Sequence, residues 1–173
     1  VMVSARRRAL WLGVNLITAF LASWVIGQFQ GTIEKIVALA VLMPIVANMG
    51  GIAGTQTLTL MIRGMATGQV SSSHATALLR RERAVGMLNG VVFSVVIAVI
   101  AMIWYDDVPL GMVMAAAILV NLVAGALAGA LIPGMLRRMS IDPALAGGVV
   151  LTTVTDVIGI VAFVGLATFI LLR

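Results

Sequence analysis

The sequence contains no cysteine and a single histidine among its 173 residues. It therefore offers no disulfide framework, no thiolate metal site and no cluster of histidine ligands. Phe, Trp and Tyr together make up 5% of the residues, which is too few for a platform on which nucleic-acid bases stack. The apolar segments also lack a His, Cys or second acid that could assist a catalytic acid, so we do not expect an enzyme.

Charged residues are equally scarce. Asp, Glu, Lys and Arg account for 10% of the residues, against roughly 25% in soluble domains, while 62% are hydrophobic. So few charges cannot cover so much apolar surface in water, and we expect lipid to be the main solvent. The net charge of +5 does not indicate a nucleic-acid partner, because the arginines form short clusters between apolar runs, as in membrane proteins.

Five continuous apolar stretches are long enough to cross a bilayer, which takes about 20 residues for a hydrocarbon layer of about 30 Å. They cover approximately Ala9–Phe29, Ile36–Ile62, Ala84–Trp104, Pro109–Leu136 and Pro143–Leu172. Because the runs do not alternate, strands are not expected. We predict an all-α integral membrane protein with five transmembrane helices in one domain, residues 1–173. Since the chain begins with Val, we expect it to be a fragment of a longer protein.

The arginine clusters predict the orientation of the chain. They precede the first span and separate the second span from the third and the fourth from the fifth, at Arg6–Arg8, Arg63, Arg80, Arg81, Arg83, Arg137 and Arg138. The other two connections are poor in arginine. The positive-inside rule then predicts a multi-pass protein of the plasma (inner) membrane, with its N-terminus in the cytoplasm and its C-terminus outside.

Residues 64–83 form the longest polar connection. Ser71–Ser73 can cap a short helix, and two leucines beside arginines suggest that this helix lies in the membrane interface before the third span. We expect His74 to be a solvated loop residue and Glu82 to neutralise the neighbouring arginines.

Other residues have structural interpretations. Asp142 directly precedes Pro143, and Asp107 stands shortly before Pro109, which is typical of helix N-caps. Pairs of small residues four positions apart allow helices to approach closely in lipid and favour a tightly packed, oligomeric bundle. These pairs are Gly50–Gly54, Gly86–Gly90, Gly125–Gly129 and Ala126–Ala130.

Asp156 is the acid that a lipid environment explains least. It lies about 20 Å along the fifth span at about 1.5 Å per residue, which is close to mid-membrane. A charge at that depth costs about 3 kcal/mol on insertion scales. No Arg or Lys stands at a matching depth in any span, so the carboxylate is either protonated or faces water and a mobile cation.

Polar residues accompany Asp156 in two stripes. On the fifth span they share one side of the helix and comprise Gly148, Thr152, Thr155 and Gly159. On the second span they comprise Asn48, Thr55 and Thr59, beside Gly50, Gly51 and Gly54 and interrupted by Ile52. Each threonine taken alone is as well explained by a hydrogen bond to its own helix. Together with Asp156, the stripes favour a path for an ion.

The donor atoms of both stripes are oxygens, which indicates a hard cation. Ca²⁺ takes about 6–8 oxygen ligands, more than one acid per chain supplies, whereas Mg²⁺ keeps several waters and needs only one or two carboxylates. A two-fold axis would bring two copies of Asp156 together. The residues therefore favour Mg²⁺ and leave Mn²⁺, Co²⁺ and Na⁺ open.

Two segments resemble a known family. NMGGIAGTQTLTLMIRGMATGQ (48–69) and DPALAGGVVLTTVTDVIGI (142–160) are similar to the signature segments of the MgtE magnesium channels. The resemblance implies a five-helix domain that forms a homodimer, with a pore at the dimer interface lined by the second and fifth helices. It also implies that Asp156 holds Mg²⁺ largely through the hydration shell of the ion.

By the same resemblance, the residues that line the pore are Gly148, Thr152 and Thr155 on the fifth helix and Asn48, Gly51, Thr55 and Thr59 on the second. The chain departs from the family at Ile52, where MgtE proteins commonly carry Asn. Family members also have cytosolic N and CBS domains, which are absent from this sequence, so we expect weaker regulation by cytosolic Mg²⁺. A proton- or sodium-coupled transporter and a non-transporting assembly subunit remain alternative interpretations.

Overall fold

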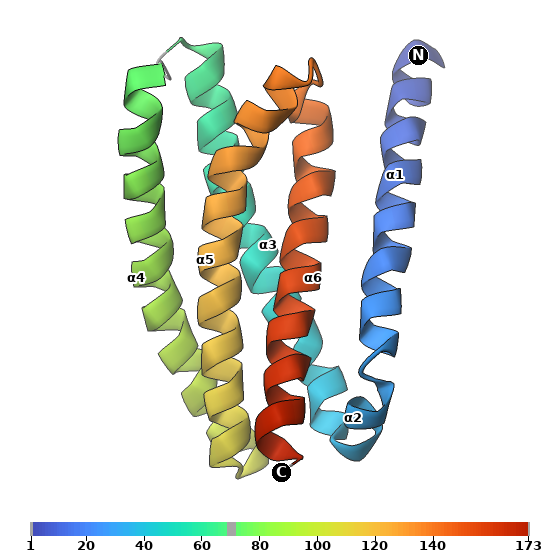
Figure 1. Cartoon of the computed structure of the whole chain (residues 1–173), viewed down its shortest axis with the longest axis vertical. Coiled ribbons are helices and arrows are strands. Elements are labelled where there is room, and N and C mark those ends of the chain that lie inside the picture. Colours follow the sequence, from blue (N-terminus) through green and yellow to red (C-terminus); the bar gives the residue numbers. More distant parts are fainter. Residues whose placement is uncertain (1, 69–71, 173) are drawn as a thin grey trace.

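The computed structural model describes residues 2–68 and 72–172 of the chain. These residues form six helices in chain order (Figure 1), with no strand in the described ranges. The helices are α1 (Met2–Gly27), α2 (Gln30–Lys35), α3 (Val37–Ala66), α4 (Ser72–Tyr105), α5 (Val108–Arg138) and α6 (Pro143–Leu171).

Five of the helices are long and apolar enough to cross a membrane, as the sequence predicts. The segments that meet this criterion are Ala9–Gly27, Val37–Ala66, Leu79–Tyr105, Val108–Arg138 and Pro143–Leu171. They agree with the predicted spans to within a few residues, because continuous hydrophobicity over this length is a strong signal. The short α2 turns the chain between the first two of them.

The prediction of a separate interfacial helix before the third span is wrong. From Ser72 onward α4 is one continuous helix that runs through Glu82 into the apolar segment. No glycine or proline stands between residues 72 and 85 to break it. The backbone of His74 therefore belongs to α4 and not to a loop. The predicted cap includes Ser71, which lies outside the described residues.

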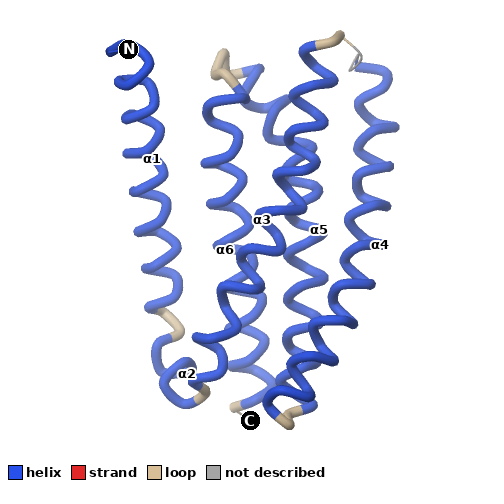
Figure 2. Tube along the Cα trace, turned by 180° about the vertical axis from the view of Figure 1, so that it is seen from behind, coloured by secondary structure: helices blue, strands red, loops and turns tan. Residues whose placement is uncertain are grey.

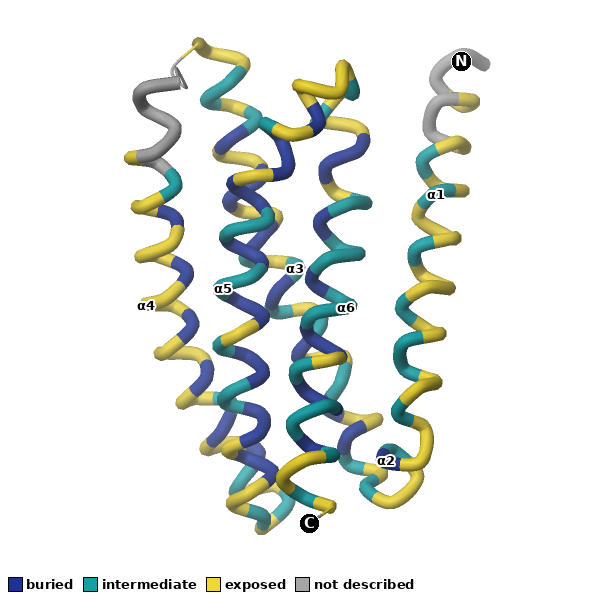
Figure 3. The backbone as a smooth tube through the Cα atoms, in the orientation of Figure 1, coloured by how far each residue is buried: buried dark blue, intermediate teal, exposed yellow. Residues whose placement is uncertain are grey.

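Helix α5 occupies the middle of the bundle. It packs against α3, α4 and α6, and α6 packs in turn against α3 and α1. Figure 3 shows buried positions along most of α5, whereas every α1 residue whose burial is described is exposed or half-buried. Seen from behind in Figure 2, α1 and α4 stand at opposite sides of the molecule. The exposed apolar side chains of these two outer helices match a surface that contacts lipid.

The apolar core is built from α3, α5 and α6. Its largest cluster includes Leu42, Met114 and Phe163, each at most 2% exposed, and a smaller cluster contains Leu58 and Leu151. Such burial in lipid reflects packing between helices more than removal from water.

Glycines bring α3 and α5 into backbone contact. A Cβ atom placed on Gly125 would overlap the carbonyl oxygen of Gly50, and one on Gly129 would overlap that of Gly54. On the other side of α5, Ala126 fills the space left by Gly86 of α4. The predicted role of these small residues in close packing is confirmed, here within one chain.

The two predicted N-caps are confirmed. Asp107 precedes α5 and its Oδ1 accepts a hydrogen bond of 2.9 Å from the backbone N–H of Leu110. Asp142 precedes α6 and accepts one of 2.9 Å from the N–H of Ala144. These caps fix the residues at which α5 and α6 begin after short connections. The short connection between α5 and α6 keeps them antiparallel neighbours.

The two termini lie at opposite ends of the bundle (Figure 1). The end that holds the N-terminus also holds the last turns of α3 and α5 and the first turns of α4 and α6. We call it the arginine-rich end, because it carries Arg6, Arg63, Arg80, Arg81, Arg83, Arg137 and Arg138. One-sided placement of these arginines is what the positive-inside rule requires of a five-span chain.

Candidate cation site

Asp156 lies near the middle of α6 and is half-buried. Its carboxylate has neither a hydrogen-bond donor nor a basic side chain as partner within residues 2–68 and 72–172. A carboxylate in a membrane-spanning helix without such a partner normally faces a cavity, water or a bound cation. The structure therefore leaves this acid available for an ion.

The threonines of α6 differ in their surroundings. Thr152 is half-buried, and its hydroxyl donates to the carbonyl oxygen of Gly148 at 3.0 Å. Thr155 is 0% exposed, donates to the carbonyl oxygen of Leu151 at 3.1 Å and lies against Gly51 of α3. Thr155 thus packs between the two helices, while Gly148, Thr152 and Asp156 are at least partly open.

The polar stripe of α3 lies on its exposed side. Asn48, Thr55 and Thr59 are exposed, and Gly51 is half-buried. The hydroxyl of Thr55 donates to the carbonyl oxygen of Gly51 and that of Thr59 to the carbonyl oxygen of Thr55, each at 2.8 Å. Because each hydroxyl hydrogen is used inside the helix, the oxygen remains free to accept a hydrogen bond from water.

Ile52 stands within this stripe and is 49% exposed. Its neighbour Gly51 lies beside Thr155, so Ile52 is at the level of Asp156 on the facing helix. The departure from the family therefore places an exposed apolar side chain on α3, close to the depth of Asp156 on α6.

Together these residues form a polar face on the outside of the single chain, which we call the open polar face: Asn48, Gly51, Thr55, Thr59, Gly148, Thr152 and Asp156. In Figure 2, α3 crosses in front of the bundle, with α6 beside it. Contact between lipid and this many polar groups is unfavourable at membrane depth. The face therefore requires a cover that supplies water or protein.

A comparison with known proteins decides the family. The sequence model of the MgtE family, described as "Divalent cation transporter", matches residues 43–166. The chain belongs to the MgtE family. The matched segment contains every residue of the open polar face.

Three relatives of this MgtE-family chain cover nearly all of it. It is 34% identical to the "Magnesium transporter MgtE" of Bacillus subtilis over 96% of the chain and 37% of that protein. It is 31% identical to the protein of the same name from Thermus thermophilus and 28% identical to that from Enterococcus faecalis, over 95% of the chain and 36% of each relative. The chain thus spans a little more than a third of the length of these relatives.

Asn121 is a residue of this MgtE-family chain that sequence reasoning missed. It is 0% exposed in the middle of α5, and its Nδ2 donates to the carbonyl oxygen of Val46 at 2.7 Å. A Cβ on Gly50 of α3 or Gly159 of α6 would overlap its carboxamide. Asn121 therefore sets how closely the two helices of the open polar face approach. A lone carboxamide inside an apolar span is the signal that could have found it.

The role predicted for Glu82 is wrong. Its side chain is 7% exposed, and its Oε2 accepts a hydrogen bond of 3.0 Å from Oγ1 of Thr57 on α3. It forms no ion pair with a basic side chain in the described part of this MgtE-family chain. The α-helical phase turns Glu82 inward while its arginine neighbours face outward.

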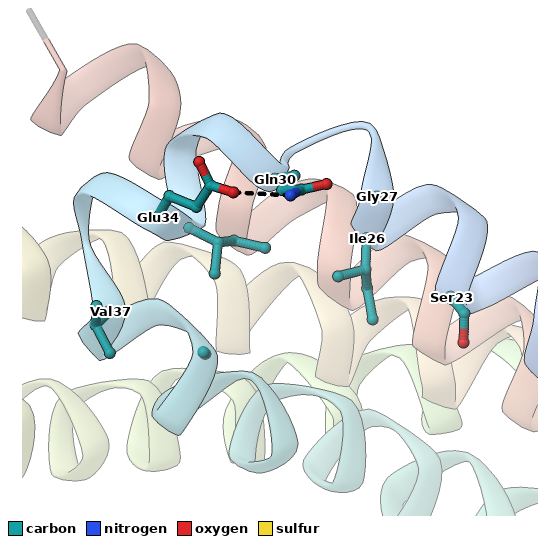
Figure 4. A pocket seen from close by; sticks show the side chains of 8 residues that line it. Ser23, Ile26, Gly27, Gln30, Glu34 and Val37 are labelled. Carbon is teal, nitrogen blue, oxygen red and sulfur yellow. Dashed lines mark hydrogen bonds between the residues drawn. The ribbon is translucent and has the colours of Figure 1, made fainter.

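A pocket of 430 Å³ lies near the end of the bundle opposite the arginine-rich end, between α1, α2 and the start of α3 (Figure 4). Most of its lining is apolar, and its one acid, Glu34, accepts a hydrogen bond of 2.7 Å from Gln30. None of the open polar face lines it. This pocket is therefore separate from the candidate cation site.

Proposed function

We propose that this chain is the membrane-embedded part of a magnesium transporter, in which two copies pass hydrated Mg²⁺ along a path between their open polar faces. Membership of the MgtE family supports divalent-cation transport as the activity. The names of the relatives support Mg²⁺ as the ion. Mn²⁺ and Co²⁺ share its preference for oxygen ligands and are expected to compete with it.

Asp156 carries this proposal. It is half-buried at the middle of α6, without a protein partner among the described residues. In a homodimer two such carboxylates would face each other across the two-fold axis and balance the charge of one Mg²⁺ ion. Mg²⁺ keeps several of its waters, so direct coordination by further side chains is not needed.

The hydration shell of the ion explains the role of the other residues of the open polar face. Waters bound to Mg²⁺ point their hydrogens outward and need acceptors. Thr55, Thr59 and Thr152 offer hydroxyl oxygens whose own hydrogens are engaged in the helix. Asn48 adds a carboxamide oxygen, while Gly51 and Gly148 leave room. Thr155 acts behind this lining, because it is fully buried between the helices.

We further propose that the arginine-rich end lies in the cytoplasm and that the protein resides in the plasma membrane. The arginines at the ends of α3 and α5 would then meet the anionic inner leaflet. The C-terminus would lie outside.

The test is Mg²⁺ uptake into liposomes that contain the purified chain. We expect uptake down the Mg²⁺ gradient to persist after ionophores collapse the proton and sodium gradients, because the path is a wet pore. Uptake that stops when either gradient is removed would contradict the pore and indicate a coupled transporter, in which Asp156 carries a proton or Na⁺.

A further inference from the structure

A second polar pocket lies near the arginine-rich end, between α3, α4 and α5. It has a volume of 230 Å³, and its polar lining consists of Gln56, Thr57, Arg81, Glu82 and Asn89. Apolar side chains of the three helices close its remaining walls. None of its residues belongs to the open polar face.

Glu82 dominates the electrostatics of this pocket. It is 7% exposed, and the hydroxyl of Thr57 is its partner among the described residues. A neutral hydroxyl on one oxygen does not balance a buried carboxylate, which requires a cation or a proton. Arg81 lines the same pocket but is exposed and forms no ion pair with Glu82 within the described ranges.

The size and lining of the pocket suit a hydrated cation. A volume of 230 Å³ has room for several water molecules, as the shell of a hydrated Mg²⁺ ion requires. Gln56 and Asn89 add two carboxamide oxygens that can accept hydrogen bonds from the shell.

The pocket is also next to the proposed path. Gln56 follows Thr55 on α3 and is likewise exposed, so one wall of the pocket borders the open polar face. An ion at this end meets the field of the surrounding arginines, which repels cations. A buried acid beside the path offsets that repulsion locally.

We propose that the pocket around Glu82 is a second divalent-cation site, which takes hydrated Mg²⁺ through outer-sphere contacts with Glu82, Gln56 and Asn89. The site goes beyond the proposed pore. It rests on the proposed function for the identity of the ion.

Mn²⁺ binding measured by electron paramagnetic resonance, with Mg²⁺ as competitor, tests this site in the full chain. The background variant is Asp156→Asn, which removes the pore acid. We expect Mn²⁺ to bind this variant in the millimolar range, and adding Glu82→Gln to weaken that binding roughly tenfold. Glu34→Gln, an exposed acid at the other end, is the matched control and should leave it unchanged. Equal Mn²⁺ binding with and without Glu82→Gln would overturn the site, whatever Asp156→Asn does to flux.

Two milder variants test the site if Glu82→Gln does not fold. Gln56→Leu and Asn89→Leu replace exposed residues and should each weaken Mn²⁺ binding several-fold. Unchanged binding in both would reject the site. If the Glu82→Gln variant lost co-purified phosphatidylethanolamine but kept its Mn²⁺ binding, the cation site would also be rejected. The pocket would then be assigned to the amine of a lipid headgroup.

Discussion

At the residue scale, the threonines of α3 and α6 serve the helix and the solvent at once. Thr55, Thr59 and Thr152 donate to the carbonyl oxygen four residues earlier, so their hydroxyl hydrogens are engaged. The sequence left a choice between helix bonding and ion contact for each of them. The structure shows that helix bonding occurs, and it leaves the hydroxyl oxygens as acceptors on the open polar face.

Ile52→Asn tests the composition of that face. Ile52 is 49% exposed, so an asparagine fits there without repacking the core. We expect Mg²⁺ flux in liposomes to rise several-fold, since a carboxamide can hydrogen-bond the hydration shell where the isoleucine cannot. Ile52→Val is the control and should leave the flux near that of the native chain. A flux lowered by Ile52→Asn would show that the apolar side chain assists conduction.

Asn121→Ala tests the buried carboxamide between the two lining helices. The change removes the hydrogen bond to Val46 and leaves a cavity beside Gly50 and Gly159. We expect a loss of about 1–3 kcal/mol in stability, measured by thermal unfolding in detergent. Asn15→Ala on the exposed side of α1 is the matched control and should change little. Equal stability of the two variants would contradict the positioning role of Asn121.

At the element scale, glycine spacing decides how α3 and α5 cross. Gly125 and Gly129 meet the carbonyl oxygens of Gly50 and Gly54, so the two backbones touch without intervening side chains. Small residues four positions apart are readable from sequence because they lie on one helix face. Which helix they meet is not readable, since that depends on the arrangement of the whole bundle.

Gly125→Ala and Gly134→Ala form a matched pair on α5. A Cβ on Gly125 would overlap the backbone of Gly50, whereas nothing lies within 4 Å of one on Gly134. We expect Gly125→Ala to destabilise the chain by about 1–3 kcal/mol through overpacking. Gly134→Ala should be neutral or slightly stabilising, because alanine favours the helix. Thermal unfolding that ranks the two variants in the opposite order would refute the close crossing.

Sequence patterns predicted some features of these helices and not others. Long apolar runs located the five spanning helices, and Asp107 and Asp142 marked two helix starts correctly. The prediction for α4 was wrong in separating a short helix from the third span, because no helix breaker stands between them and the helix runs on from Ser72. The role of Glu82 was predicted wrongly and Asn121 was missed, because their partners, Thr57 and Val46, lie 25 and 75 residues away in sequence.

At the scale of the whole molecule, the exposed polar groups of α3 and α6 require a cover. In the proposed homodimer, a second copy related by a two-fold axis would supply the same polar face and enclose a wet path between the two chains. The outer helices α1 and α4 keep their apolar side chains toward lipid in such an arrangement.

Cross-linking tests the dimer directly, because the chain has no cysteine of its own. We expect Thr59→Cys to give a covalent dimer with a short thiol-reactive cross-linker in liposomes. Ile103 lies on α4 and is 79% exposed, and the Ile103→Cys variant should remain monomeric under the same conditions. Dimer formation by Ile103→Cys in place of Thr59→Cys would move the interface to the other side of the bundle.

The most direct test of the account compares Mg²⁺ flux in liposomes for the native chain, Asp156→Asn and Asp107→Asn. Asparagine caps a helix as well as aspartate does, so Asp107→Asn should conduct normally. We predict that Asp156→Asn folds and dimerises but loses roughly tenfold or more of the flux, equivalent to about 1.4 kcal/mol. Full Mg²⁺ flux through folded Asp156→Asn would contradict the proposal that the ion passes this carboxylate.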